Sequence, residues 1–176
     1  MTRWRFAVLA PLVLVVLAAA AILVKQPWAS SEPVAFKPPF PELSSTGEPI
    51  RAVYEGRVPC ERPCQVLKVS LVLYGNPSSG AAGTYWLGLV QVAVSDDRIV
   101  RNGAWTTRRG AAGAPDATVY ELDVNAPAGL RRYWAVSNDV LLPLDDQTMS
   151  PRVGTGAFGY VLSRYSGTYG PRTYPE

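Results

Sequence analysis

The residues best placed to do chemistry are the two cysteines of the chain, Cys60 and Cys64, with Glu61-Arg62-Pro63 between them. In an exported domain an even cysteine count favours a disulfide, and a bridge over so few residues would mainly fix the shape of a loop. Two alternatives stay open. The pair could exchange thiols, although the Cys-x-x-Cys motif of thioredoxin-type proteins is absent, or two thiolates could hold one cuprous ion.

Histidine is absent from the 176 residues, and Met149 is the only methionine after Met1. Imidazole is therefore missing as a general base and as the usual ligand of haem, zinc or copper(II), and a methionine-rich copper site is excluded. Ser-His-Asp and Cys-His catalysis are excluded as well. The residue types thus predict a protein that is not an enzyme and that carries no cofactor.

Two acidic doublets and one glycine pair complete the candidates. Asp96-Asp97 and Asp145-Asp146 could share a proton or bind calcium, but both fall at expected hairpin turns. Aspartate favours turns because its side chain bonds the local backbone, and we interpret both doublets in this way. Gly154-x-Gly156 lacks the strand–loop–helix setting of a phosphate site and is interpreted as loop.

The N-terminus contains an apolar run from Phe6 to Val24 that follows Arg3 and Arg5. A bilayer-spanning helix needs about 20 such residues, whereas the apolar core of a signal peptide has about 7–15. The run predicts a transmembrane helix, or signal-anchor, within residues 1–26.

The flanking charges give that anchor a direction. The positive-inside rule places the N-terminus in the cytoplasm and the C-terminal domain in the periplasm, on a single pass through the bacterial inner membrane, with residues 6–24 in the lipid bilayer. A cleaved signal peptide with its site near Ala29-Ser30-Ser31 is the alternative. A lipoprotein is excluded because no cysteine lies near the end of the apolar run.

Residues 27–49 form a proline-rich segment with Ser and Glu between the prolines. Dense proline forbids helix and favours extended polyproline geometry, which predicts a linker between anchor and domain. The plain interpretation is a spacer. The competing one uses Phe36 and Phe40 as anchors that lay the linker on a neighbouring surface.

Residues 50–165 show only short alternating apolar runs between turn signals, which is the all-β pattern. In one run Leu67, Val69, Leu71 and Leu73 share a face, with Lys68 and Ser70 on the other, as in a strand with one wet face. The expected strands are Ile50–Val58, Val66–Tyr74, Thr84–Val94, Ile99–Thr107, Thr118–Val124, Arg131–Ser137, Val140–Leu144 and Gly156–Tyr165.

About eight short strands with hairpin-length links predict a small antiparallel meander closed into a β-barrel, and a two-sheet sandwich is the alternative. The tail, residues 166–176, is too rich in Gly and Pro to extend this core, and Tyr169 and Tyr174 are its candidate anchors for a partner. The aromatic residues of the strands are expected to fill the barrel, although a cavity for a lipid or pigment is an alternative. The formal net charge of +3 lacks the clustering of a nucleic-acid binder, so no nucleic acid is expected.

One family resemblance extends over approximately residues 52–147. It rests on Tyr54-x-Gly56-x-x-Pro59-Cys60, Gly103-x-Trp105, Tyr120-x-Leu122 and Asn138-Asp139-Val140-Leu141-x-x-Leu144-Asp145. In this order the motifs resemble the N-terminal domain of the copper-resistance lipoprotein NlpE family. The resemblance implies a lipocalin-like barrel in the bacterial envelope and a link to envelope stress, surface sensing and copper tolerance.

The chain departs from that family in three ways. Three residues separate Cys60 from Cys64 where the family has two, the lipid-bearing cysteine is missing, and there is no second domain with its own cysteine pair. We therefore expect a non-enzymatic accessory subunit of a membrane assembly, such as a respiratory or photosynthetic complex, with integral membrane subunits as partners and protein–protein interaction as its work. The alternatives are an NlpE-like envelope-stress or copper-tolerance sensor and a barrel that binds lipid or pigment.

Overall fold

The computed structural model describes residues 39–76, 82–154 and 159–165. The expected anchor, most of the expected linker and the tail lie outside these residues. The described chain forms eight strands: β1 (Ile50–Pro59), β2 (Val66–Tyr74), β3 (Gly83–Val92), β4 (Arg98–Ala111), β5 (Ala114–Leu122), β6 (Arg132–Ser137), β7 (Val140–Pro143) and β8 (Leu162–Arg164).

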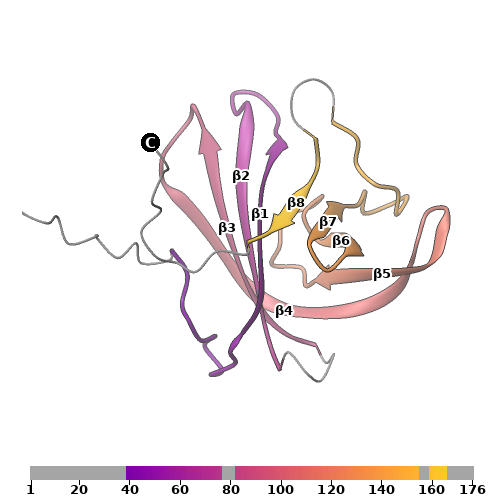
Figure 1. The fold of residues 1–176 in the computed structure, drawn as a ribbon. Helices are drawn as coiled ribbons and strands as arrows, with labels where there is room; N and C mark the ends of the chain where they lie inside the picture. Colours follow the sequence, from indigo (N-terminus) through magenta and orange to yellow (C-terminus); the bar gives the residue numbers. More distant parts are fainter. Residues whose placement is uncertain (1–38, 77–81, 155–158, 166–176) are drawn as a thin grey trace, which may run out of the picture. The chain divides into compact units, whose positions relative to one another are not determined.

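These strands form a closed barrel in sequence order. Each strand runs antiparallel to the next, and β8 closes the barrel by pairing antiparallel with β1, with Gly56 opposite Leu162. A β-carbon at Gly56 would collide with the backbone of Val161 and the side chain of Leu162, so this position must be glycine for the closing strand to approach. The predicted all-β antiparallel barrel of about eight strands is confirmed (Figure 1).

The β4–β5 hairpin is longer than the sequence predicts. The expected strands Ile99–Thr107 and Thr118–Val124 leave a break between them, but β4 continues to Ala111, which pairs with Ala114. The glycines of that stretch are the reason. Gly110, with a φ of 99°, falls at the register shift between Arg109 and Ala111, and Gly113, with a φ of 75°, makes the turn, so they continue the hairpin rather than end it.

Strand β2 is buried on both faces over its second half. Val69, Leu71 and Leu73 line the interior as predicted, and Lys68 is exposed. The expected wet face is wrong beyond Ser70, however, because Val72 and Tyr74 are also buried, at 0% and 2% exposure. Residues 39–49 cover this part of the outer face, as described below.

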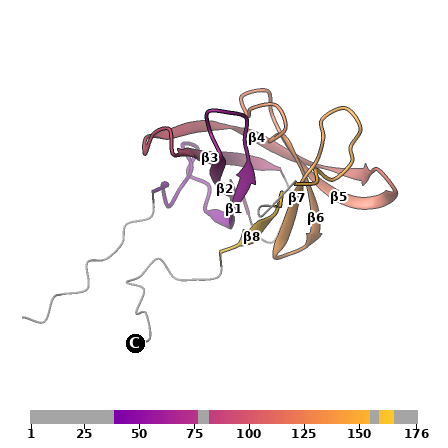
Figure 2. The same cartoon turned by 90° about the horizontal axis from the view of Figure 1, so that it is seen from above.

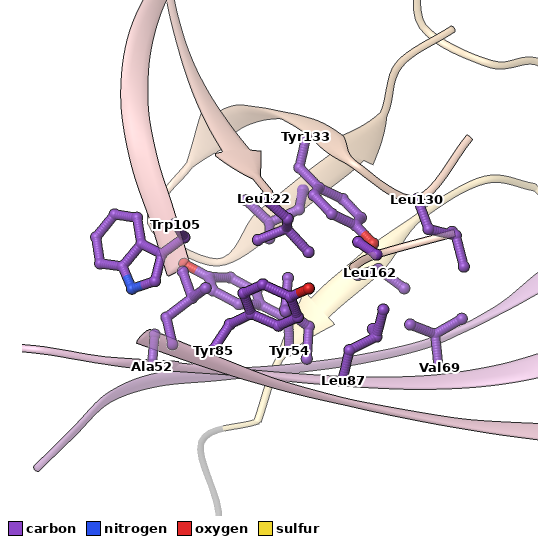
Figure 3. Packing of buried hydrophobic residues seen from close by; sticks show 14 of the residues in the cluster. Ala52, Tyr54, Val69, Tyr85, Leu87, Trp105, Leu122, Leu130, Tyr133 and Leu162 are labelled. Carbon is purple, nitrogen blue, oxygen red and sulfur yellow. The ribbon is translucent and has the colours of Figure 1, made fainter. Parts of the chain in front are cut away.

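The barrel interior is filled by side chains from its own walls. Tyr54, Tyr85, Tyr133 and Leu122 point toward one another from four different strands (Figure 3). Trp105, on β4, is fully buried and donates its Nε1–H to the carbonyl oxygen of Tyr74 over 2.9 Å. The remaining core consists of aliphatic side chains that include Leu71, Leu73, Leu87, Leu89, Leu130, Leu141 and Leu162.

Candidate functional site

The loop that joins β1 to β2 is closed by a disulfide between Cys60 and Cys64, whose Cα atoms lie 5.7 Å apart. The predicted disulfide is confirmed. Cys64 is 4% exposed, so its half of the bridge is buried. Because the bond uses both sulfur atoms, this oxidised form offers neither a free thiol for exchange nor a pair of thiolates for a cuprous ion.

A pocket of about 340 Å³ opens beside this loop, where the ends of β1–β4 meet the loop after β5. Aliphatic side chains form its walls. Its charged groups are Arg101, Arg152 and Glu61. We call this hollow the mouth pocket, and it is lined by Val58, Pro59, Cys60, Glu61, Leu67, Leu89, Gln91, Ile99, Arg101, Pro127, Ala128, Leu130 and Arg152.

Arginine 152 holds one wall of the mouth pocket in place. Its Nη1 donates to the carbonyl oxygen of Gly129 over 3.1 Å, its Nη2 donates to the hydroxyl of Tyr160 over 3.2 Å, and its guanidinium carbon lies 4.3 Å from the Tyr160 ring centroid. Asp146 fixes the same loop from the other side, since its Oδ2 accepts the Gly129 N–H over 2.9 Å. The pocket wall is thus built by specific contacts.

The acidic doublets divide into turn residues and one loop anchor. Asp97 accepts a hydrogen bond from Ser95 Oγ over 3.0 Å, and Asp145 Oδ1 accepts the N–H groups of Gln147 and Thr148 over 3.0 and 2.8 Å. These backbone donors lower the pKa of Asp145. The turn interpretation is confirmed for these two, whereas Asp146 holds the loop at Gly129 beside the mouth pocket, a role that the sequence did not reveal.

Residues 39–49, which we call the strap, lie on the outer face of the barrel (Figure 1, indigo). Phe40 is 4% exposed, and its ring centroid lies 5.7 Å from that of Trp86 on β3. Tyr74 donates its hydroxyl to the carbonyl oxygen of Pro41 over 2.8 Å. Phe40, predicted as an anchor on a neighbouring surface, therefore has its own barrel as a neighbour.

A carboxylate fastens the other end of the strap. Glu48 Oε2 accepts the Thr84 hydroxyl over 2.6 Å and the Thr84 N–H over 3.1 Å. These bonds, chiefly that from the Thr84 hydroxyl, lower the pKa of Glu48. Beside the strap lies an open groove of about 620 Å³, lined by Pro41, Leu43, Ser44, Ser45, Tyr74, Thr84, Tyr85, Trp86, Asn102 and Gly103.

The register of the first four strands brings three cations into one line on the outer face. Arg57 on β1 lies opposite Lys68 on β2, Lys68 opposite Val90 on β3, and Val90 opposite Arg98 on β4. Residues directly opposite each other point to the same side of a sheet, and all three cations are exposed. We call Arg57, Lys68 and Arg98 the cation row.

Sequence reasoning missed the cation row because its members come from three strands. Alternation placed Lys68 on the outer face, but only the pairing register sets Arg57 and Arg98 beside it. The signal in the sequence was one basic residue in or next to each of three expected strands, with Arg98 one position before the expected start at Ile99. Without the register those residues are indistinguishable from scattered surface charges.

Several expectations fall outside the described residues. Phe36, Tyr169 and Tyr174, the other candidate anchors, belong to this group, as does the apolar run over residues 6–24. Within the ranges that the structure describes, no helix is long and apolar enough to cross a bilayer. The same ranges contain no group of three or more Cys, Asp or Glu side chains that would suit a metal ion.

Comparison of the chain with protein-family models, with curated proteins and with solved structures gives no match. The function of the protein must therefore be inferred from four of its own features: the barrel, the mouth pocket, the strap and the cation row.

Proposed function

We propose that this chain is a non-enzymatic, membrane-anchored barrel of the bacterial periplasm that serves as an accessory subunit of a membrane protein complex. Its N-terminal helix would cross the inner membrane, and its barrel would bind other subunits through the outer surface. We also propose that the barrel is lipocalin-like, because an eight-stranded up-and-down meander closed on itself is the lipocalin arrangement. The resemblance to the NlpE family supports the envelope location.

The observation that carries this proposal is the filled interior. Trp105, Tyr133, Leu71 and Leu87 are each fully buried, and sixteen buried residues form one continuous cluster. A barrel that carries a large ligand keeps its centre open, whereas this one spends its central volume on its own side chains. Binding is thereby directed to the outer surface and to the rim.

The strap limits how far the barrel could lie from the membrane. Because residues 39–49 lie against the outer face of the barrel, only residues 25–38 would connect the expected membrane helix to the body of the domain. Fully extended, these residues span about 50 Å at most. A barrel on so short a connection would work next to the membrane, where the exposed parts of other membrane subunits lie.

Purification of the full-length chain tests this proposal. The chain, carrying a C-terminal tag, is extracted from its native membranes in a mild non-ionic detergent, and the proteins that stay bound are identified by native mass spectrometry. We expect integral membrane subunits at a fixed stoichiometry that survives dilution. A chain that runs as a lone monomer, in a detergent that keeps other membrane complexes intact, contradicts the accessory role.

The mouth pocket favours a second candidate function, the binding of a small molecule at the barrel rim. Its volume of about 340 Å³ lies at the lower end of ligand pockets, and it combines aliphatic walls with Arg101 and Arg152. An amphiphile with one anionic group would fit this chemistry, with Glu61 as the one opposing charge.

Two tryptophan variants on one strand test this second function. Ile99→Trp fills the mouth pocket, while Val100→Trp adds the same bulk on the other face of β4, and both positions are 38% exposed. We expect a small molecule that co-purifies with the wild-type protein to be lost in the first variant and kept in the second. Equal retention in both variants would remove the pocket from consideration.

A further inference from the structure

The cation row carries positive charge that the described part of the chain does not neutralise. Within that part, the ion pairs join Glu121 to Arg108 and to Arg132, and neither involves the row. Glu55, two residues from Arg57 on β1, lies opposite Ser70 and Ser163 and forms no ion pair with another described residue.

This arrangement works against folding. Arg57 and Lys68 are paired directly across two adjacent strands, and like charges in that position destabilise a sheet. Among the described residues no carboxylate forms an ion pair with the row, so its charge is open to an anion from outside. The missing counter-charge would come from a binding partner.

Arg98, at one end of the row, packs on aromatic side chains of the outer face. The Arg98 guanidinium carbon lies 5.8 Å from the Trp86 ring centroid, and Trp86 in turn lies against Phe40 of the strap. The Trp86 indole lies across Gly88, which has no side chain in its way. A β-carbon at that position would collide with the indole. Half-buried Val90, between Lys68 and Arg98, gives the row an apolar floor.

The spacing of the row matches an extended acidic segment. Adjacent strands lie about 4.8 Å apart, so the backbone positions of Arg57 and Arg98, three strands apart, are separated by about 14 Å. In an extended chain the residues i and i+4 lie about 13 Å apart and point to the same side. Carboxylates at i, i+2 and i+4 would therefore cover the whole row from one side of one segment.

We propose that the cation row binds an extended acidic segment, with Asp or Glu at alternate positions, from a subunit of the membrane complex. This inference rests on the proposed function and names the partner chemistry. A protein segment fits better than an anionic bilayer, because Asp96 and Asp97 in the β3–β4 turn and Glu61 in the disulfide loop flank the row at the same end of the strands. A flat anionic surface would meet these acids, whereas one segment avoids them.

The test uses a defined probe and a matched pair of charge reversals. The probe is a fluorescent twelve-residue peptide with Glu at alternate positions and Ser between them, and its binding to the full-length protein in non-ionic detergent is followed by anisotropy at low salt. Lys68→Glu reverses the central charge of the row. Arg109→Glu makes the same change at an exposed position on the β4–β5 hairpin, with no described ion pair.

We expect Lys68→Glu to weaken peptide binding about tenfold or more, since an attraction becomes a repulsion, and Arg109→Glu to leave it within about twofold. Lys68→Glu also creates an opposite-charge pair with Arg57 across the strands, so its thermal midpoint should hold or rise. Loss of binding in a protein that is at least as stable as the wild type cannot come from unfolding.

Each other outcome overturns the inference. A wild-type protein that ignores the peptide, or two variants that weaken it equally, would show that the row is not an acidic-segment site. Displacement of the peptide by phosphatidylglycerol in mixed micelles, at equal charge concentration, would assign the row to lipid headgroups. In either case the accessory role still stands if membrane subunits co-purify with the Lys68→Glu protein, so the two proposals fail separately.

Discussion

At the scale of single residues, the barrel depends on side chains that are buried and hydrogen-bonded at the same time. Trp105 is the main example. Its ring is fully buried and lies edge-on to Tyr120 at 5.5 Å, and its Nε1–H satisfies the carbonyl oxygen of Tyr74 at the end of β2. The Arg51 guanidinium carbon lies 5.1 Å from the ring centroid. One residue thus ties β4 to β2 across β3.

We predict that Trp105→Phe lowers the free energy of unfolding by about 2–3 kcal/mol, because the Tyr74 carbonyl loses its donor and the core loses volume. Urea unfolding followed by far-UV circular dichroism measures the change. Trp134→Phe, at a half-buried position with no described hydrogen bond, should cost less than about 1 kcal/mol. Equal losses in the two variants would show that the Trp105 hydrogen bond adds nothing.

The Glu48–Thr84 contact gives a prediction in pH. The folded pKa of Glu48 is lowered from its ordinary value of 4.5, so its stabilisation is complete above that value and is lost as the pH falls through the lowered pKa. Thr84→Val removes the hydroxyl donor and should cost about 0.5–1 kcal/mol at pH 7, since water still screens this part-buried contact.

Measurement of unfolding from pH 7 to pH 3 in both proteins tests this prediction. The difference between wild type and Thr84→Val should shrink as the pH falls, because protonated Glu48 gains less from the hydroxyl. A difference that stays constant with pH would mean that the hydroxyl acts through strand packing and not through the carboxylate.

At the scale of elements, three features set how the strands are arranged: the pairing of β4, the position of the strap and the disulfide. Strand β4 pairs with β3 up to Trp105 and with β5 from Trp105 onward, so a single strand connects the β1–β3 side of the barrel to the rest (Figure 2). The strap covers the outer side of β2 and β3. The disulfide closes the β1–β2 loop.

Removal of that disulfide should have a small effect. The Cys60→Ser/Cys64→Ser double variant is expected to lose about 2 kcal/mol of unfolding free energy, because the closed loop is short and restricts few unfolded conformations. Denaturant titrations with and without reductant measure this loss, and reductant should change only the wild-type protein. A loss above about 4 kcal/mol would indicate that the loop determines the fold of the barrel end.

At the scale of the whole molecule, the closed barrel and the strap on its outer face together bring the hydroxyls of four tyrosines into buried surroundings. Burial raises the pKa of Tyr54 and of Tyr74 from 10.0 to about 12. The pKa values of Tyr85 and Tyr133 are raised further, again chiefly by burial. The hydroxyl of Tyr133 and Oδ1 of Asp146 have no hydrogen-bond partner in the described structure. Burial and the lack of a hydrogen-bond donor therefore both disfavour the Tyr133 phenolate.

These raised tyrosine pKa values predict a steep loss of folding stability at alkaline pH. Because the folded pKa values are raised, the stabilisation is complete below pH 10, where unfolded tyrosine is neutral, and it is lost as the pH rises from 10 toward 12. Unfolding free energies at half-unit steps from pH 8.5 to 11.5 test this. Tyr54→Phe should make the loss shallower, and a barrel equally stable at pH 8.5 and pH 11.5 would contradict the assignment.

The sequence by itself determined the fold class and the loop chemistry. Alternating residues from Leu67 to Leu73, turn residues between short runs, and one cysteine pair sufficed, because these signals are local: a side chain's place along a strand and its neighbours in a turn decide them. The predicted bounds of β2 are those observed, and the Cys60–Cys64 disulfide formed as expected.

Only the tertiary structure decided what the surface carries. The sequence could not show that Phe40 lies on Trp86, because the two lie 46 positions apart, nor that Arg57, Lys68 and Arg98 form one row. It also gave the second half of β2 a wet face, since nothing local shows that a strap will lie over Tyr74. Strand register and covering segments are set by contacts distant in the chain, and those contacts define the candidate sites of this protein.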